Sequence, residues 1–153
     1  MPSRRLKEYL DKNGIKYISI QHSPAYTSQE IAAQAHIPGK LLAKTVIVKI
    51  EGKMAMVVLP ANRKVILPEL RAALDAEKAT LASEEEFKET FPDCELGAMP
   101  PFGNLYGMDV YVSPELSFEQ EIAFNAGTHT ELIKMAYKDF ERLVKPKVVS
   151  FST

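Results

Sequence analysis

The stretch KTVIVKIE at residues 44–51 is followed by Gly52-Lys53 and then by MAMVVL at residues 54–59. Both runs are rich in β-branched and other apolar residues, which favour extended strands on a partly buried sheet. The glycine between them allows the backbone to reverse its direction within a short turn. The sequence therefore predicts a β-hairpin at residues 44–59.

Similar patterns on both sides of this hairpin predict further strands and several helices. A second hairpin is expected from residues 121–125 and 130–135, which are joined by Ala126-Gly127-Thr128-His129. Helical spacing and capping pairs predict the helices. The expected helices are 3–13, 27–37 (capped by Thr27 with Glu30), one that begins at Leu67, one that follows the capping pair Ser83 with Glu86 and carries Phe87 and Phe91, and 137–144. The other expected strands are 15–21, 78–82, 108–112 and 148–151. A turn is expected at Ser113–Glu115. Hairpins interrupted by helices indicate an α/β protein of the α+β type, with a mixed, largely antiparallel sheet and helices packed outside it.

Length, composition and charge limit the class of protein. The chain has 153 residues, of which 46% are apolar and 25% charged, and we expect residues 1–153 to form one domain. No apolar run is long enough to cross a bilayer and no secretory leader is recognised, so we expect a soluble cytoplasmic protein. The single cysteine, Cys94, excludes an internal disulfide, which agrees with a reducing compartment. A formal charge of −1 excludes a protein that wraps nucleic acid, although a small contact with a nucleic-acid end is compatible with it.

The usual motifs of cofactor, nucleophile and metal sites are absent from the sequence. There is no Walker loop, dinucleotide-binding fingerprint, nucleophile elbow or helical His-Glu-x-x-His pattern. The three histidines, His22, His36 and His129, lack metal-ligand spacing, so neither a metal nor a cofactor is expected. Cys94 is interpreted as a packing residue, because no histidine lies near it in the sequence to lower the pKa of its thiol.

The stretch GAMPPFGNLYG at residues 97–107 has the composition of a rigid site wall. Its glycines allow unusual backbone conformations, while Pro100 and Pro101 fix φ and remove two amide donors. Two further residues are open to a functional and a structural interpretation. Lys44 is either a solvated strand residue, which its charge favours, or a cation that points into a cleft. His129 either donates to a ligand oxygen or caps its hairpin.

Four segments, taken in order, resemble the YbaK family of prolyl-tRNA synthetase-associated editing domains, and the resemblance covers nearly the whole chain. The segments are the helix start Thr27-Ser28-Gln29-Glu30, KTVIV at residues 44–48, GAMPPFG at residues 97–103 and AGTHTELI at residues 126–133. The resemblance implies a mixed α/β fold with a barrel-like sheet surrounded by helices. It also implies a freestanding domain that hydrolyses mischarged aminoacyl-tRNA in trans.

The resemblance assigns roles to particular residues. Lys44 matches the family's strand lysine and is expected to hold the 3′-terminal nucleotide of the tRNA, which reverses its interpretation as a merely solvated lysine. Gly97 is expected close to the aminoacyl ester, and His129 on the opposite side of the same pocket. These three form the predicted catalytic set, and the predicted substrate-binding residues are Thr27, Met99, Pro100, Pro101, Gly103, Gly127 and Thr128.

The missing nucleophile is consistent with this activity, because an aminoacyl ester is already activated and needs mainly a positioned water. Backbone amides near Gly97 could stabilise the oxyanion, while His129 or the substrate's own hydroxyl groups could guide the water. Met99, Pro100 and the helix after Thr27 would limit the size of the amino acid, as in a second editing site.

The expected partner is the acceptor 3′ end of an aminoacyl-tRNA; a partner synthetase is left open, and neither DNA nor a membrane is expected. The candidate tRNA contacts are Lys40, Lys44, Lys49 and Lys53. The edited amino acid is also open, because the MPPFG loop and the GTHT turn differ from the signatures of the alanine-, cysteine- and proline-directed branches. Two alternatives are a binding module for tRNA ends or small ligands without turnover, and a generic small-ester hydrolase, which the missing nucleophile-and-base pair disfavours.

Overall fold

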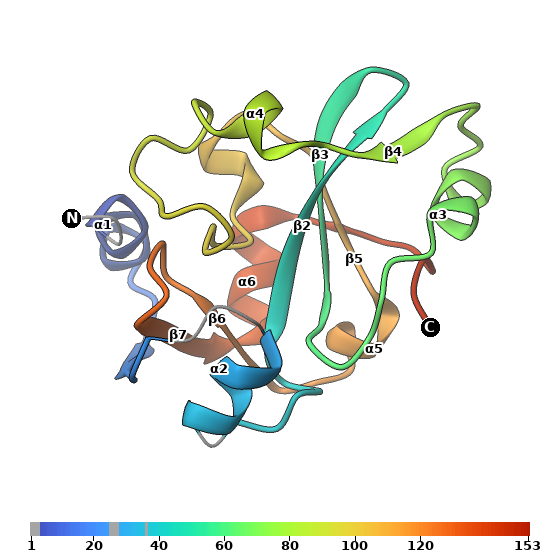
Figure 1. The fold of residues 1–153 in the computed structure, drawn as a ribbon. Coiled ribbons are helices and arrows are strands. Elements are labelled where there is room, and N and C mark those ends of the chain that lie inside the picture. Colours follow the sequence, from blue (N-terminus) through green and yellow to red (C-terminus); the bar gives the residue numbers. More distant parts are fainter. Residues whose placement is uncertain (1–3, 25–27, 36) are drawn as a thin grey trace.

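The computed structural model describes residues 4–24, 28–35 and 37–153. In these residues the strands form one sheet of three strands and one of five (Figure 1). The three-stranded sheet is antiparallel throughout and has the order β1 (Tyr17–Gln21), β7 (Glu131–Ala136), β6 (Glu121–Asn125). The five-stranded sheet has the order β4 (Ala79–Leu81), β2 (Ala43–Ile50), β3 (Lys53–Pro60), β5 (Val110–Val112), β8 (Lys147–Val148). In this sheet the β4–β2 and β2–β3 pairs are antiparallel, whereas the β3–β5 and β5–β8 pairs are parallel. The predicted mixed sheet is therefore confirmed.

Both predicted hairpins are present. In the β2–β3 hairpin, Ile50 pairs with Lys53, which leaves only Glu51 and Gly52 in the turn. The φ angles of these two residues are 52° and 84°. Two positive φ values are what a two-residue hairpin turn that matches the strand twist requires, and glycine meets this requirement without steric cost.

The barrel-like closure implied by the resemblance is not observed, since neither sheet closes within the described residues. Among the described residues, an isolated parallel bridge between Leu42 and Ala123 joins the two sheets, and there the Ala123 amide donates to the Leu41 carbonyl at 3.0 Å. The reason lies in the edges of β2. One edge pairs with β3 over the whole strand, and the other pairs with β4 from Val48 to Ile50, so only the beginning of β2 is open to β6.

The helices mostly lie where the sequence predicts them. They are α1 (Arg4–Lys12), α2 (Ser28–Ala35), α3 (Leu67–Ala73), α4 (Glu84–Phe87), α5 (Pro114–Ser117) and α6 (Tyr137–Val144), with a 3₁₀ turn at Gly103–Leu105. The predicted capping box of Ser83 with Glu86 is confirmed at the start of α4. In the described part of the chain, none of these helices is both long and apolar enough to cross a bilayer.

Two local predictions are wrong. Helix α4 ends at Phe87 and does not reach Phe91, because the Thr90 amide donates to the Phe87 carbonyl in a tighter turn ahead of Pro92. The two phenylalanine rings nevertheless meet edge to face, with centroids 6.2 Å apart. The turn predicted at Ser113–Glu115 is instead the start of α5, since a proline is tolerated in the first turn of a helix.

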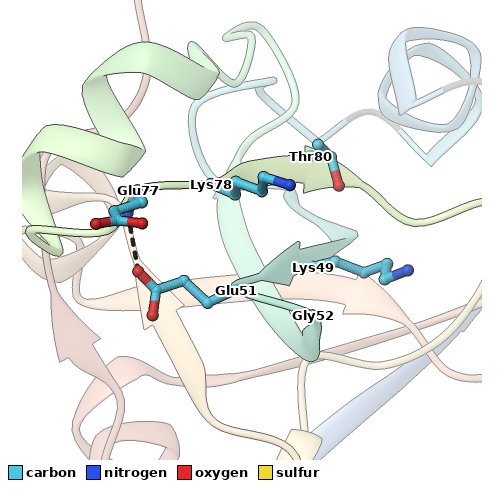
Figure 2. Close-up of a pocket in the computed structure, with 6 residues that line it drawn as sticks. All are labelled: Lys49, Glu51, Gly52, Glu77, Lys78 and Thr80. Atoms are coloured by element: carbon cyan, nitrogen blue, oxygen red, sulfur yellow. Dashed lines mark hydrogen bonds between the residues drawn. The ribbon is translucent and has the colours of Figure 1, made fainter.

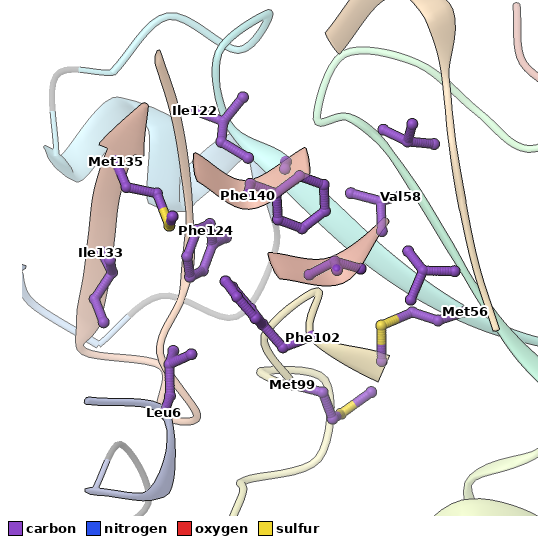
Figure 3. Packing of buried hydrophobic residues seen from close by; sticks show 14 of the residues in the cluster. Leu6, Met56, Val58, Met99, Phe102, Ile122, Phe124, Ile133, Met135 and Phe140 are labelled. Atoms are coloured by element: carbon purple, nitrogen blue, oxygen red, sulfur yellow. The ribbon is translucent and has the colours of Figure 1, made fainter. Parts of the chain in front are cut away.

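The main core lies between the two sheets and has Phe102 near its centre (Figure 3). The Phe102 side chain is fully buried, and its ring centroid lies 5.5 Å from that of Phe124 on β6 and 5.6 Å from that of Phe140 on α6. Met56 and Val58 of β3 belong to the same cluster. Residues 98–103 of the stretch at 97–107 are therefore buried, whereas Gly97, Asn104 and Gly107 are exposed.

Gly103, which the sequence analysis placed among the substrate-binding residues, packs tightly against the strand that follows it. A Cβ atom at Gly103 would lie 2.7 Å from Val110 Cγ2 and 3.0 Å from the Met108 carbonyl oxygen. Overpacking of this kind typically costs about 1–3 kcal/mol. We expect Gly103→Ala to lower the free energy of unfolding by about that amount in urea titrations.

A matched control for this variant is Gly39→Ala. An alanine Cβ at this position would lie 3.5 Å from Asn62 Cβ, which is ordinary van der Waals contact. We therefore expect a much smaller change in stability. Equal stabilities of the two variants would show that the backbone at Gly103 moves aside without cost.

Candidate functional site

The loop that contains Gly97 is hydrogen-bonded to the turn between β6 and β7. The Glu95 amide donates to the Gly127 carbonyl at 2.8 Å, and the Gly127 amide donates to the Ala98 carbonyl at 2.9 Å. The φ angles of Gly97 and Gly127 are 86° and 97°, in the region that favours glycine. Two segments that are distant in sequence are thus joined through their backbones.

The His129 side chain lies across this junction. Its Nε2 atom is 2.9 Å from the Leu96 carbonyl oxygen, and its backbone amide donates to Glu95 Oε1 at 2.6 Å. Because a carbonyl can only accept, Nε2 carries a proton, and in the neutral ring the lone pair is on Nδ1, which is buried. A Cβ atom built on Gly97 would lie 3.5 Å from His129 Cε1. The structure therefore brings together the predicted residues Gly97 and His129.

We expect Glu95→Ala to loosen this junction, because it removes the acceptor for the His129 amide. A hydrogen bond of this kind contributes about 0.5–1.5 kcal/mol, which corresponds to a roughly two- to tenfold change in a local opening equilibrium. The Gly127 amide proton should exchange faster with deuterium by about this factor. Glu89→Ala, which changes another exposed glutamate that forms no hydrogen bond or ion pair with the described residues, is the control and should leave that exchange rate unchanged.

The other predicted residues of the loop face the interior. Met99 is 5% exposed and belongs to the core cluster, and Pro100 and Pro101 are buried. The Gly97 amide, which was expected to face the ester, donates to Met99 Sδ at 3.3 Å. A thioether is a weak acceptor, so this contact would yield readily to an oxyanion.

The remaining predicted residues fall on the turn and on the helix start. Thr128 Oγ1 accepts from the Thr130 amide at 3.4 Å, which fixes the turn beside His129. Thr27 lies outside the described residues. No group of three or more metal-ligating side chains is found where the structure describes the chain.

Lys44 lies apart from this pair. It is paired with Leu59 in the β2–β3 ladder, and its side chain lines a hollow together with Val46, Lys64, Val65, Leu67 and Leu81. Val46 and Leu67 pack against the smaller core cluster of Val57 and Leu59, whereas Ile47 packs in the Phe102 core, so this hollow is on the face of β2 turned away from Phe102. The hydrogen bonds described above for Gly97 and His129 run to Met99, Glu95 and Leu96 and do not reach Lys44.

The bridge between the two sheets shows where Lys44 lies relative to the turn between β6 and β7. Leu42 and Ala123 pair in parallel, so Lys44 and Asn125 each lie two residues further along in the same direction. Burial lowers the pKa of the Lys44 ammonium group, and the nearby positive charge of Lys64 lowers it further. Lys44 is therefore less strongly hydrated than an ordinary surface lysine.

Asn125 is a residue of this region that the sequence analysis missed. Its Oδ1 atom is buried and has no hydrogen-bond partner in the part of the chain that the structure describes. A buried polar atom is usually satisfied, so one that is not suggests a ligand or a water. The available signal was an amide residue at the end of a predicted strand, directly before Ala126-Gly127.

Of the other candidate lysines, Lys49 is already paired. Its Nζ atom lies 2.6 Å from Glu86 Oε2, and Lys49 also lines a hollow of about 690 Å³ beside the β2–β3 turn and β4 (Figure 2). That hollow contains the carboxylates of Glu51 and Glu77 as well as Lys78, so it offers little net positive charge. Lys40 and Lys53 are exposed.

Comparison with known proteins assigns this architecture to a family. The family model described as "Aminoacyl-tRNA editing domain" matches residues 22–143, a range that includes Lys44, Gly97, Asn125 and His129. The chain belongs to the aminoacyl-tRNA editing domain family. The resemblance noted from the four segments is thereby confirmed.

Individual relatives and solved structures agree with this membership. The chain is 28% identical over 157 residues to the "Multifunctional Ser/Thr-tRNA deacylase ProXp-y" of Escherichia coli strain K12 and to that of strain O157:H7, covering 97% of this chain and 91% of each relative. A crystal structure described as a candidate trans-editing enzyme for prolyl tRNA synthetase matches with a TM-score of 0.83 at 19% identity, covering 99% of this chain and 97% of that one. A hypothetical protein matches with a TM-score of 0.87 at 18% identity, covering 98% and 100%. The two structures support the fold of this editing domain.

Proposed function

We propose that this editing domain is a hydrolase that removes the amino acid from mischarged aminoacyl-tRNA in trans. The observation that carries the proposal is the contact of Gly97 with His129, made by two segments that both lie within the family match. Residues 1–153 would act as one freestanding domain in the cytoplasm. The partner would be the acceptor 3′ end of the tRNA.

The proposed reaction is attack of a water molecule on the aminoacyl ester, with the amide groups near Gly97 stabilising the oxyanion. His129 is then a positioning residue, because its Nε2 atom holds the Leu96 carbonyl and its Nδ1 atom is buried. The proton of the water would pass to a hydroxyl group of the substrate or to solvent. The bond between the acyl carbon and the tRNA ester oxygen then breaks, and that oxygen takes a proton relayed from the water through the same hydroxyl group or solvent, which releases the free amino acid and the tRNA hydroxyl.

Selection of the amino acid would depend on the space near Gly97 and on Asn125. The Asn125 Oδ1 atom could accept a hydrogen bond from the α-ammonium group of the aminoacyl ester. Because the relative in Escherichia coli is named a Ser/Thr-tRNA deacylase, seryl- and threonyl-tRNA are the first substrates to consider. Met99 and Pro100 are buried, so they would act indirectly, by holding the loop that contains Gly97 in place.

A binding module without turnover is the second candidate function. The observation that favours it is that the Gly97 amide and the His129 ring are both engaged within the protein. Such a module would use the same surface to hold a tRNA end without hydrolysing it.

The test is to incubate the protein with a panel of aminoacyl-tRNAs, correctly and incorrectly charged and including seryl- and threonyl-tRNA, and to measure release of the amino acid. We expect release from selected mischarged members. Absence of release from every member, with tRNA binding retained, would favour the binding module. Rapid hydrolysis of simple esters without tRNA would favour a generic esterase.

A further inference from the structure

The hollow that contains Lys44 has an unusual combination of charge and apolar surface. It has a volume of about 270 Å³ and lies between β2, the edge strand β4 and the start of α3. Two of its six lining residues, Lys44 and Lys64, are lysines and none is acidic. The larger hollow of Figure 2 has two glutamates beside its two lysines.

The two lysines have no counter-ion in the described structure. Neither Lys44 nor Lys64 forms a side-chain hydrogen bond or ion pair with the described residues, and the charge of Lys64 lowers the pKa of Lys44. Two like charges held near each other, one of them partly desolvated, destabilise the unliganded protein. An anion bound between them would remove this repulsion, so the site is suited to a phosphate.

The remaining walls of the hollow are aliphatic. Leu81 is 57% exposed on β4, a short strand at the edge of the sheet. Val46, Val65 and Leu67 complete a surface that is only partly buried. A ligand that combines an anion with a flat apolar group would satisfy both parts of the hollow, and a nucleotide is such a ligand.

We propose that Lys64 acts together with Lys44 to bind one phosphate of the single-stranded 3′ end of the tRNA, with the base of that nucleotide packed against Val46 and Leu81. This rests on the proposed function, because it takes the RNA to be the aminoacyl-tRNA substrate. Lys64 would then be a substrate-binding residue in a segment that the four family-like motifs do not include.

The first test uses an RNA minihelix that carries the acceptor 3′ overhang, with affinity measured by fluorescence anisotropy over a range of salt concentrations. Loss of one phosphate contact lowers the slope of log K against log salt concentration by about 0.7 for single strands. We expect Lys64→Ala to show this decrease with weaker binding, and Lys64→Arg to retain most of the affinity. A blunt minihelix without the overhang should bind wild type and Lys64→Ala equally.

The matched control is Lys12→Ala, which removes an exposed lysine from α1, at the opposite side of the molecule from α3 (Figure 1). Identical affinities and salt slopes for Lys64→Ala and Lys12→Ala would overturn the inference. Leu81→Ala should weaken binding of the overhang without changing the salt slope. An unchanged affinity for Leu81→Ala would overturn the proposal that the base packs against Leu81.

Deacylation by the wild-type protein, measured in parallel, separates this inference from the proposed function. If no aminoacyl-tRNA is hydrolysed but Lys64→Ala weakens binding of the overhang, the hydrolase proposal fails and the binding site stands. If hydrolysis is observed and Lys64→Ala binds the overhang as wild type does, the binding site fails and the hydrolase proposal stands.

Discussion

Replacing Lys44 with methionine should lower kcat/KM for deacylation of aminoacyl-tRNA by about 10²-fold, the size of loss that follows when a substrate is misplaced by about an ångström. Methionine keeps much of the apolar stem that packs in the hollow beside Val46 and Leu67 but removes the cation. The fold should therefore be retained. Single-turnover release of the amino acid measures the effect directly.

Two companion variants make the Lys44 result specific. Lys12→Met removes an exposed lysine from α1 and should leave the rate unchanged. Lys44→Arg should recover part of the activity, since it restores the charge. A wild-type rate for Lys44→Met would exclude Lys44 from the substrate site, whereas a lower rate at undiminished tRNA affinity would place it in the chemical step.

Phe102→Ala should lower the free energy of unfolding by about 3–5 kcal/mol, as expected for removing a phenylalanine from a packed core. The ring is fully buried and lies against Phe124 from the three-stranded sheet and Phe140 from α6. Its loss would leave a cavity where the two sheets meet the loop of residues 97–107. Urea denaturation followed by circular dichroism measures the change.

Phe118→Ala is the control for this prediction, because its side chain is 85% exposed. Surface substitutions usually change stability by no more than about 0.5 kcal/mol. If Phe102→Ala were as stable as Phe118→Ala, the core would have collapsed around the missing ring, and Phe102 would not be its central packing residue.

The elements that the sequence predicted well are those set by short-range patterns. Both hairpins follow from alternating strands around glycine-containing turns, and α4 begins at its capping pair, Ser83 with Glu86. Closure of the sheet could not be predicted, because it depends on how the edges of β2 are shared between β3, β4 and a single bridge to β6. Such long-range competition leaves no local signal.

The candidate site likewise combines features that local motifs predict with features that depend on the fold. The family-like motifs predicted that Gly97 and His129 line one pocket; the structure places the two residues beside each other, and their part in a substrate site stays a prediction. The sequence could not show that Met99 would turn into the core, since an apolar residue in a rigid loop suits a pocket wall and a core equally. It also could not show that Lys44 would share a hollow with Lys64, which is twenty positions away in the sequence and comes near it only through the fold.

The paired hydrogen bonds between Gly127 and residues 95 and 98 constrain how this domain can diversify. Inserting or deleting one residue in either segment would put the two backbones out of register and move the Leu96 carbonyl away from the His129 ring. Chain length at this junction is therefore under tight restriction. New substrate preferences would therefore arise by substitution of side chains on this backbone. Insertions and deletions would instead accumulate at turns outside the junction.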